Sequence, residues 1–216
     1  IATNRDTASA FLREIQLTAV KPIEPVFVDF KKDMSTAKLK SGLPLLYKKN
    51  ETTDVFEVMY VFDMGRNHDA TLGTAFDYLS YLGTSKKSPA EIKKEFFDIA
   101  CSFNASVTDE RCYVSVSGLS ENMPKALKLM EELIADAKPD ENVLANLKAD
   151  HIKARADAKL NQGRNFGALR RYVMYGPEHI KATTLTNDAL KALSSNTLLA
   201  KVRDLFTKQH SVLYYG

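Results

Sequence analysis

Tryptophan is absent from this chain of 216 residues, and cysteine is scarce, with only Cys101 and Cys112. Two cysteines separated by ten residues form neither a disulfide framework nor a zinc-binding pattern. Cys112 falls in an alternating apolar segment, where a small buried side chain is the expected role. The cysteines therefore do not indicate whether the protein works in an oxidising or a reducing compartment.

Long apolar runs are also missing. No segment approaches the ~18 apolar residues that a membrane-spanning helix requires, so we expect no membrane span. No signal peptide is recognisable, and the chain starts at Ile1 without methionine. Both ends look cut from a longer protein. An exported location, such as the periplasm, would follow if that protein carries a signal peptide.

A concentration of charge of one sign is the third absence. The 30 Lys and Arg residues are interleaved with 27 Asp and Glu residues, which leaves a net charge of +3. Nucleic-acid-binding domains usually gather their basic residues on one face and carry a recognisable motif. We therefore expect no nucleic-acid partner. A hydrophobic content of 44% suits a globular protein with a real core.

The first 34 residues have the pattern of a helix followed by a linker. Apolar residues recur at helical spacing between residues 8 and 19, and Pro22 and Pro25 then exclude continued helix. Residues 26–30 are short and extended. We interpret residues 1–34 as a leading helix and linker from a preceding domain.

The remainder, residues 35–216, reads as a single α+β domain with a mainly antiparallel sheet packed against helices. Residues 55–62 are apolar on both faces, which is typical of a central strand covered on two sides. The other predicted strands are residues 43–49, 103–108, 111–117 and 211–215, and the predicted helices are residues 72–82, 89–99, 123–137, 144–158, 169–175, 186–193 and 196–206.

Several helix ends can be assigned from single residues. Ser88 and Glu91 form a capping box, with proline at the first helical position. Gly83 follows a periodic helix, as a left-handed C-cap would. Thr186 and Asn196 are predicted N-caps. Residues 162–167 interrupt the pattern, and the next helix stops at Gly176-Pro177.

The helix at residues 72–82 resembles the metal-binding helix of the insulinase/pitrilysin family of zinc metallopeptidases. That helix carries the inverted motif His-x-x-Glu-His, followed shortly by Gly-Thr. When Gly83-Thr84 is the anchor, the two histidine positions fall on Thr74 and Tyr78, and the glutamate position falls on Asp77. The helix and the Gly-Thr that follows it are present, and the metal ligands are missing. We expect no metal site and no catalytic residue in this chain.

The resemblance extends over about residues 43–216. The hairpin from Phe103, the helix after it and the passage beginning Tyr175-Gly-Pro all follow the family's order. Family members contain two or four such domains arranged as a clamshell, in which one half carries zinc. The resemblance implies a non-catalytic domain of a zinc metalloendopeptidase, which completes the chamber and helps to position peptide or unfolded polypeptide for a zinc site in a catalytic half.

Other functions remain open. A structural or assembly subunit of the same fold is the main alternative, and an unrelated ligand-binding domain is a third. An independent hydrolase is disfavoured because no Gly-x-Ser-x-Gly elbow or phosphate loop is present.

Several polar residues near the motif have a simpler interpretation than a role in a site. Asp77 is expected to be a solvated helix-face acid. The family's third ligand corresponds to a helix that offers Asp150 and His151 here, and His151 is more simply a hydrogen-bonded interior residue. His68, His179 and His210 are expected on the surface.

Asn104 and Ala105 match edge-strand positions that pair with substrate backbone in an active half. A covered or blunted edge is the plainer interpretation. Arg170, Arg171 and Tyr172 could contact a carboxylate or another domain, or lie on a solvated helix face.

Overall fold

The computed structural model describes residues 8–216, and its contacts divide the chain into two units at Asp33 and Met34. In the first unit, Ser9 caps α1 (Ala10–Leu17) by accepting a hydrogen bond from the Leu12 backbone nitrogen at 3.2 Å. The side chains of α1 are all exposed, including Phe11 and Ile15. The predicted leading helix is therefore present without an apolar partner among the described residues.

The second unit contains a six-stranded sheet with the order β1-β2-β6-β3-β5-β4. Only β2 and β6 pair in parallel, and the other neighbours are antiparallel, which confirms the α+β class with a mainly antiparallel sheet. The strands are β1 (Ser35–Lys38), β2 (Pro44–Lys48), β3 (Val55–Phe62), β4 (Cys101–Val107), β5 (Cys112–Leu119) and β6 (Ser211–Tyr215). The short β1 was not predicted, because its Ser-Thr-Ala-Lys sequence is polar and short.

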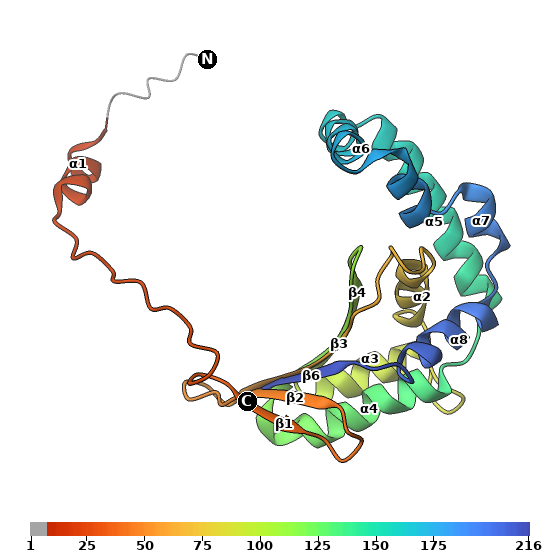
Figure 1. Cartoon of the computed structure of the whole chain (residues 1–216), viewed down its shortest axis with the longest axis horizontal. Helices are drawn as coiled ribbons and strands as arrows, with labels where there is room; N and C mark the ends of the chain where they lie inside the picture. The colour runs from red at the N-terminus through yellow and green to blue at the C-terminus, as the bar shows by residue number, and fades with distance from the viewer. Residues whose placement is uncertain (1–7) are drawn as a thin grey trace. The chain divides into compact units, whose positions relative to one another are not determined.

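One face of the sheet carries the core. In β3, Phe56, Val58 and Phe62 are buried against the helices, whereas Glu57 and Met59 on the opposite face are half-buried. The expectation that β3 is covered on two sides is wrong, although the strand is central. The helices of this layer are α2 (Leu72–Leu79), α3 (Pro89–Asp98), α4 (Met123–Asp136) and α8 (Ser195–Leu205) (Figure 1).

The remaining helices extend beyond this layer (Figure 1). They are α5 (Glu141–Lys159), α6 (Gln162–Thr183) and the short α7 (Asn187–Ala192), and a 3₁₀ turn, η1 (Ser120–Asn122), precedes α4. The buried residues of α5 are Leu144 and Leu147 near its start, and α6 buries Thr183 alone. Among residues 8–216, no helix combines the length and apolar composition needed to cross a membrane.

The helix ends confirm some caps and correct others. The Ser88–Glu91 capping box and the Thr186 cap are present. The expected interruption at residues 162–167 is wrong: α6 begins there, because the Asn161 side chain accepts a hydrogen bond from the Arg164 backbone nitrogen at 2.9 Å. The predicted break is confirmed at Gly176, where φ is 78°.

Two further caps were wrong. Ser194, not Asn196, caps α8, and its hydroxyl accepts from the Thr197 backbone nitrogen at 3.3 Å. Gly83 does not take a left-handed conformation, since α2 ends before it at Leu79. A glycine is still required there, because an added Cβ would lie 2.2 Å from the carbonyl oxygen of Lys87.

Candidate functional site

Tyr78, at the second histidine position of the resembled motif, anchors α2 to two other helices. Its side chain is fully buried, and its hydroxyl accepts a hydrogen bond from the Asp140 backbone nitrogen at 2.7 Å. The same hydroxyl lies 2.8 Å from Ser195 Oγ and 2.9 Å from the Asp140 carbonyl oxygen. Asp140 caps α5, and Ser195 begins α8. The phenol therefore joins the starts of both helices to α2.

The other two motif positions are equally unsuited to zinc. Thr74 is buried and offers only a hydroxyl. The Asp77 carboxylate lies 3.4 Å from Nε2 of His151, which is the one histidine close to this position. Partial burial raises the pKa of Asp77, and the charges of His151 and Arg66 oppose that rise without cancelling it. One carboxylate and one imidazole do not make the ligand set of a zinc enzyme.

The side chains that could ligate a metal ion are scattered along the described part of the chain. Between residues 8 and 216, no group of three or more His, Cys, Asp or Glu side chains is placed to hold a metal ion. Asp150, the other candidate third ligand, is exposed on α5. The residues present do not fit the zinc of the inverted motif, and no chemical step can be assigned to a metal here.

The β4 strand lies at one edge of the sheet, so Asn104 and Ala105 are on an edge strand. Two hydrogen bonds fix its orientation: Thr108 N donates to Arg111 O at 2.8 Å, and Leu119 N donates to Ala100 O at 3.4 Å. Hydrogen-bonded pairs alternate along an antiparallel ladder. Asn104, paired with Ser115, therefore bonds β5, whereas the backbone groups of Ala105 point away from the sheet.

The outward-facing backbone groups of β4 belong to Cys101, Phe103, Ala105 and Val107. Arg66 occupies the last of these, because its Nη1 donates to the Val107 carbonyl oxygen at 2.8 Å. α2 and α3 lie beside β4, and a groove of about 480 Å³ adjoins the start of the strand, lined in part by Ile92 and Phe96 of α3. Among the described residues, the free edge therefore spans Cys101 to Ala105, with a groove at one end and Arg66 at the other.

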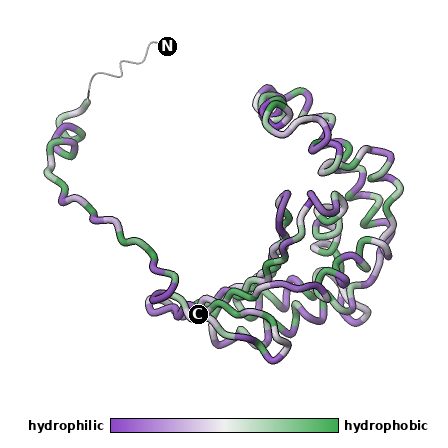
Figure 2. The backbone as a smooth tube through the Cα atoms, viewed as in Figure 1, coloured by the Kyte–Doolittle hydropathy of each residue, from purple (hydrophilic) through white to green (hydrophobic). Residues whose placement is uncertain are grey.

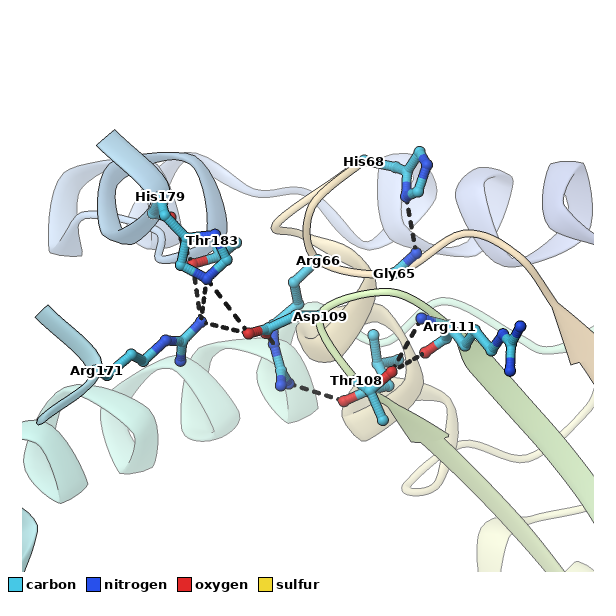
Figure 3. A network of polar contacts seen from close by, with 10 residues as sticks. Gly65, Arg66, His68, Thr108, Asp109, Arg111, Arg171, His179 and Thr183 are labelled. Atoms are coloured by element: carbon cyan, nitrogen blue, oxygen red, sulfur yellow. Dashed lines mark hydrogen bonds and ion pairs between the residues drawn. The ribbon is translucent and has the colours of Figure 1, made fainter. Parts of the chain in front are cut away.

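Asp109, in the turn between β4 and β5, collects the polar contacts at the closed end of this edge (Figure 3). Its carboxylate accepts from Arg66 Nε at 2.9 Å and from Arg171 Nη2 at 2.8 Å, and it lies 3.5 Å from His179 Nε2. Partial burial tends to raise the pKa of Asp109, but the hydrogen bond from Arg66 and the charges of Arg171, Arg66 and His179 outweigh burial and lower it. We call this the Asp109 cluster.

The cluster attaches α6 to the rest of the unit. Arg171 also donates to Thr183 Oγ1 at 3.0 Å, and the Thr183 hydroxyl donates to the His179 carbonyl oxygen at 2.8 Å. His179 is therefore part-buried in a polar network, and its expected surface position is wrong. The expectation that Arg171 could contact a carboxylate is confirmed, whereas Arg170 is exposed.

His210 also departs from its expected surface position. Only 7% of it is exposed, and its ring lies against Phe62 at a centroid distance of 4.6 Å. Its Nδ1 donates to the Lys208 carbonyl oxygen at 2.8 Å. His68, in contrast, is exposed as predicted. A single histidine near aromatic residues in sequence gives no sign of which neighbours fold onto it.

Sequence reasoning missed Arg66 and Asp109, which delimit the free edge. The available signal was an acid at a hairpin tip together with an arginine pair, Arg170-Arg171, in a segment without acids. The contact between Asp109 and Arg171 joins residues 62 positions apart. It depends on the order of strands in the sheet, which the sequence periodicity does not predict.

The fold and site together define a class of protein. It is an α+β domain in which α2, the helix following the central strand, lies beside the edge strand β4. The sequence model of the insulinase family, peptidase family M16, matches residues 45–174. The chain belongs to this family.

Individual relatives agree with that membership. An uncharacterized zinc protease of Rickettsia felis is 24% identical over 111 residues, which are 50% of this chain and 27% of that protein. The periplasmic protease PqqL from Escherichia coli superposes with a TM-score of 0.72 at 16% identity, over 99% of this chain and 25% of PqqL. An M16 inactive domain from Pseudomonas fluorescens superposes with a TM-score of 0.70 at 17% identity, over 85% of this chain and 46% of that chain. The matched regions cover about a quarter of the length of the first two proteins.

Proposed function

We propose that this chain is a non-catalytic domain of a zinc-dependent metalloendopeptidase, which presents extended peptide along β4 to a zinc site on another half. The observation that carries this proposal is the free edge from Cys101 to Ala105, beside a helix whose motif positions hold Thr74, Asp77 and Tyr78. The zinc would belong to the catalytic half, and this domain would complete the chamber around the substrate.

The edge supports binding without sequence preference. An unpaired strand offers backbone donors and acceptors that any extended polypeptide can match, and side-chain pockets add selectivity. The groove beside Ile92 and Phe96 would accept an apolar side chain of the bound segment. The contact of Arg66 with the Val107 carbonyl would stop the added strand before the hairpin tip.

A proline at position 105 tests the edge directly. The Ala105 N–H faces outward, so Ala105→Pro removes a donor for the peptide and leaves the β5 ladder intact. Binding of a fluorescein-labelled peptide without secondary structure, measured by anisotropy, should weaken roughly tenfold. Peptide cleavage by the full-length protein should fall through a raised KM, with kcat little changed.

The neighbouring residue provides the matched control. Ser106 bonds β5 through its backbone and exposes its side chain. Ser106→Ala should leave both peptide affinity and stability unchanged. If Ala105→Pro binds peptide as tightly as the parent protein and folds normally, the edge does not hold substrate and the proposal fails.

A structural or assembly role is the second candidate, and the exposed apolar side of α6 favours it. Experiments on the full-length protein distinguish the two functions. Unchanged cleavage with Ala105→Pro, combined with loss of the assembled protein when the surface of α6 is altered, would select the assembly role.

A further inference from the structure

The first segment of α6, residues 162–175, turns its apolar side to solvent. Phe166, Leu169 and Val173 follow one another at i, i+3 and i+7, the spacing of a single helix face. Their exposed fractions are 67%, 58% and 74%. We call these three residues the α6 stripe. Hydrophobic residues alternate with hydrophilic ones along this helix (Figure 2).

The opposite side of the same helix is turned inward and is polar. Arg171 lies about half a turn of the helix away from the stripe, and it donates to Asp109 and Thr183 in the Asp109 cluster. An ordinary surface helix buries its apolar face and exposes its polar one. This helix does the reverse, and the ion pair between Arg171 and Asp109 holds its polar side against the β4–β5 turn.

The charged residues of this part of the sequence have one sign, and Arg170 is the one that lies beside the stripe. Residues 158–177 contain four basic side chains, Lys159, Arg164, Arg170 and Arg171, and no acid. Arg170 follows Leu169 and borders the stripe, and no ion pair in the described part of the chain involves Arg164 or Arg170. A partner that covers the stripe must therefore supply apolar side chains and, beside them, carboxylates.

We propose that the α6 stripe is a docking surface for an amphipathic helix with acidic flanks, carried by another folded domain. Anchors at i, i+3 and i+7 are the spacing by which one helix packs on a second helix or in a groove. Contacts between Arg170 and carboxylates of the partner would fix register and orientation. The partner's acidic flank also explains why this surface has no acid of its own.

Two other occupants fit less well. A helix that lies on a membrane carries basic residues along the polar side that faces the headgroups, whereas Arg171 of this helix is engaged with Asp109. A second copy of this chain would bring Arg170 against another basic surface, where like charges oppose association. The observations favour an acidic helix from a different domain.

Two designed helical peptides of about three heptads serve as probes. They share the same leucine face, and their flanking positions carry glutamate in one and lysine in the other. Anisotropy at low ionic strength should show the glutamate peptide binding roughly tenfold more tightly than the lysine peptide. The double variant Leu169→Asp, Val173→Asp should lose this binding.

The control variant is Leu160→Asp, at an exposed residue that forms the C-cap of α5, outside the stripe. It introduces one carboxylate near α6 and should retain the preference for the glutamate peptide. Ala105→Pro should also bind the glutamate peptide normally, so a failure of edge binding and a failure of this docking surface are distinguishable.

Several results would overturn the inference. These are equal affinity for both peptides, no binding of either, and tight binding to phosphatidylglycerol vesicles that the double variant loses. Sedimentation showing a dimer that Leu169→Asp dissociates would assign the stripe to self-association instead.

Discussion

The two helices α2 and α6 use the same kinds of residue in opposite ways. Six of the eight residues of α2 are buried, including Thr74 and Tyr78 at the histidine positions of the resembled motif. In α6, a helix of 22 residues, Thr183 alone is buried, and the large apolar side chains of its first segment are exposed. One helix is held by packing and by a buried phenol, and the other by the polar Asp109 cluster.

This difference shows where the domain has fixed its structure and where it remains available for binding. At α2, Thr74 and Tyr78 at the positions of the resembled motif are part of the core, so replacing Tyr78 should disrupt the fold. At α6, the contacts are polar and the apolar surface is open, so changes there should affect partners more than folding. The variants below test this contrast, starting with the largest expected effect.

Restoring a ligand residue at α2 should be the most damaging change. Tyr78→His removes a fully buried phenol, together with its hydrogen bonds to Asp140 and Ser195. We expect a loss of roughly 3 kcal/mol in the free energy of unfolding, from the cavity and from polar groups left unpaired. Urea denaturation measures it.

Tyr78→Phe is the control, since it keeps the ring and removes the hydroxyl alone. It should cost about 2 kcal/mol. The triple variant Thr74→His, Asp77→Glu, Tyr78→His should bind zinc weakly and show negligible peptide cleavage, because partners that orient the imidazoles are missing. A variant with native stability and tight zinc binding would contradict the structural role of Tyr78.

The Asp109 cluster should give the next largest effect, confined to α6. Asp109→Asn removes the carboxylate shared by Arg66 and Arg171 and should cost about 2 kcal/mol. Hydrogen exchange should accelerate in α6 while the strands keep their protection. Equal acceleration throughout the chain would show that α6 folds as one unit with the sheet.

The same variant has a defined pH dependence. The pKa of Asp109 is lowered in the folded protein, so its contribution to stability is present above the unfolded pKa of ~3.9. That contribution disappears as the pH falls through the lower, folded pKa. The parent protein and Asp109→Asn should therefore differ most at neutral pH and converge in acid.

The sequence predicted the layout better than the contacts between distant elements. Periodicity located β3, the β4–β5 hairpin and α2, because these patterns are local and strong. It could not place Arg171 on Asp109, since 62 residues separate them. The family resemblance assigned Tyr78 to a motif position, but the role of Tyr78 depends on Asp140 and Ser195, which only the folded chain brings together.

Two glycine substitutions, one in α2 and one in α6, test how strongly the stability of each helix contributes to the stability of the whole domain. An added Cβ at Gly73 of α2 or Gly167 of α6 would meet no atom within 4 Å. Alanine at either position should stabilise its own helix by roughly 0.5–1 kcal/mol. Gly73→Ala should raise the global melting temperature, whereas Gly167→Ala should slow hydrogen exchange in α6 alone. Equal shifts in melting temperature would remove the distinction.

The smallest effect should come from the α6 stripe. Leu169 is 58% exposed and Val173 is 74% exposed, so replacing them gives up little buried area. Leu169→Gln and Val173→Gln should each change the free energy of unfolding by less than about 0.5 kcal/mol. The informative measurement pairs this stability with affinity for the glutamate-flanked peptide, which should fall while stability stays constant. A loss of more than about 1 kcal/mol would mean that these side chains pack within the domain, because surface substitutions rarely cost that much. In that case the contrast between a packed α2 and an open α6 would not describe the protein in solution.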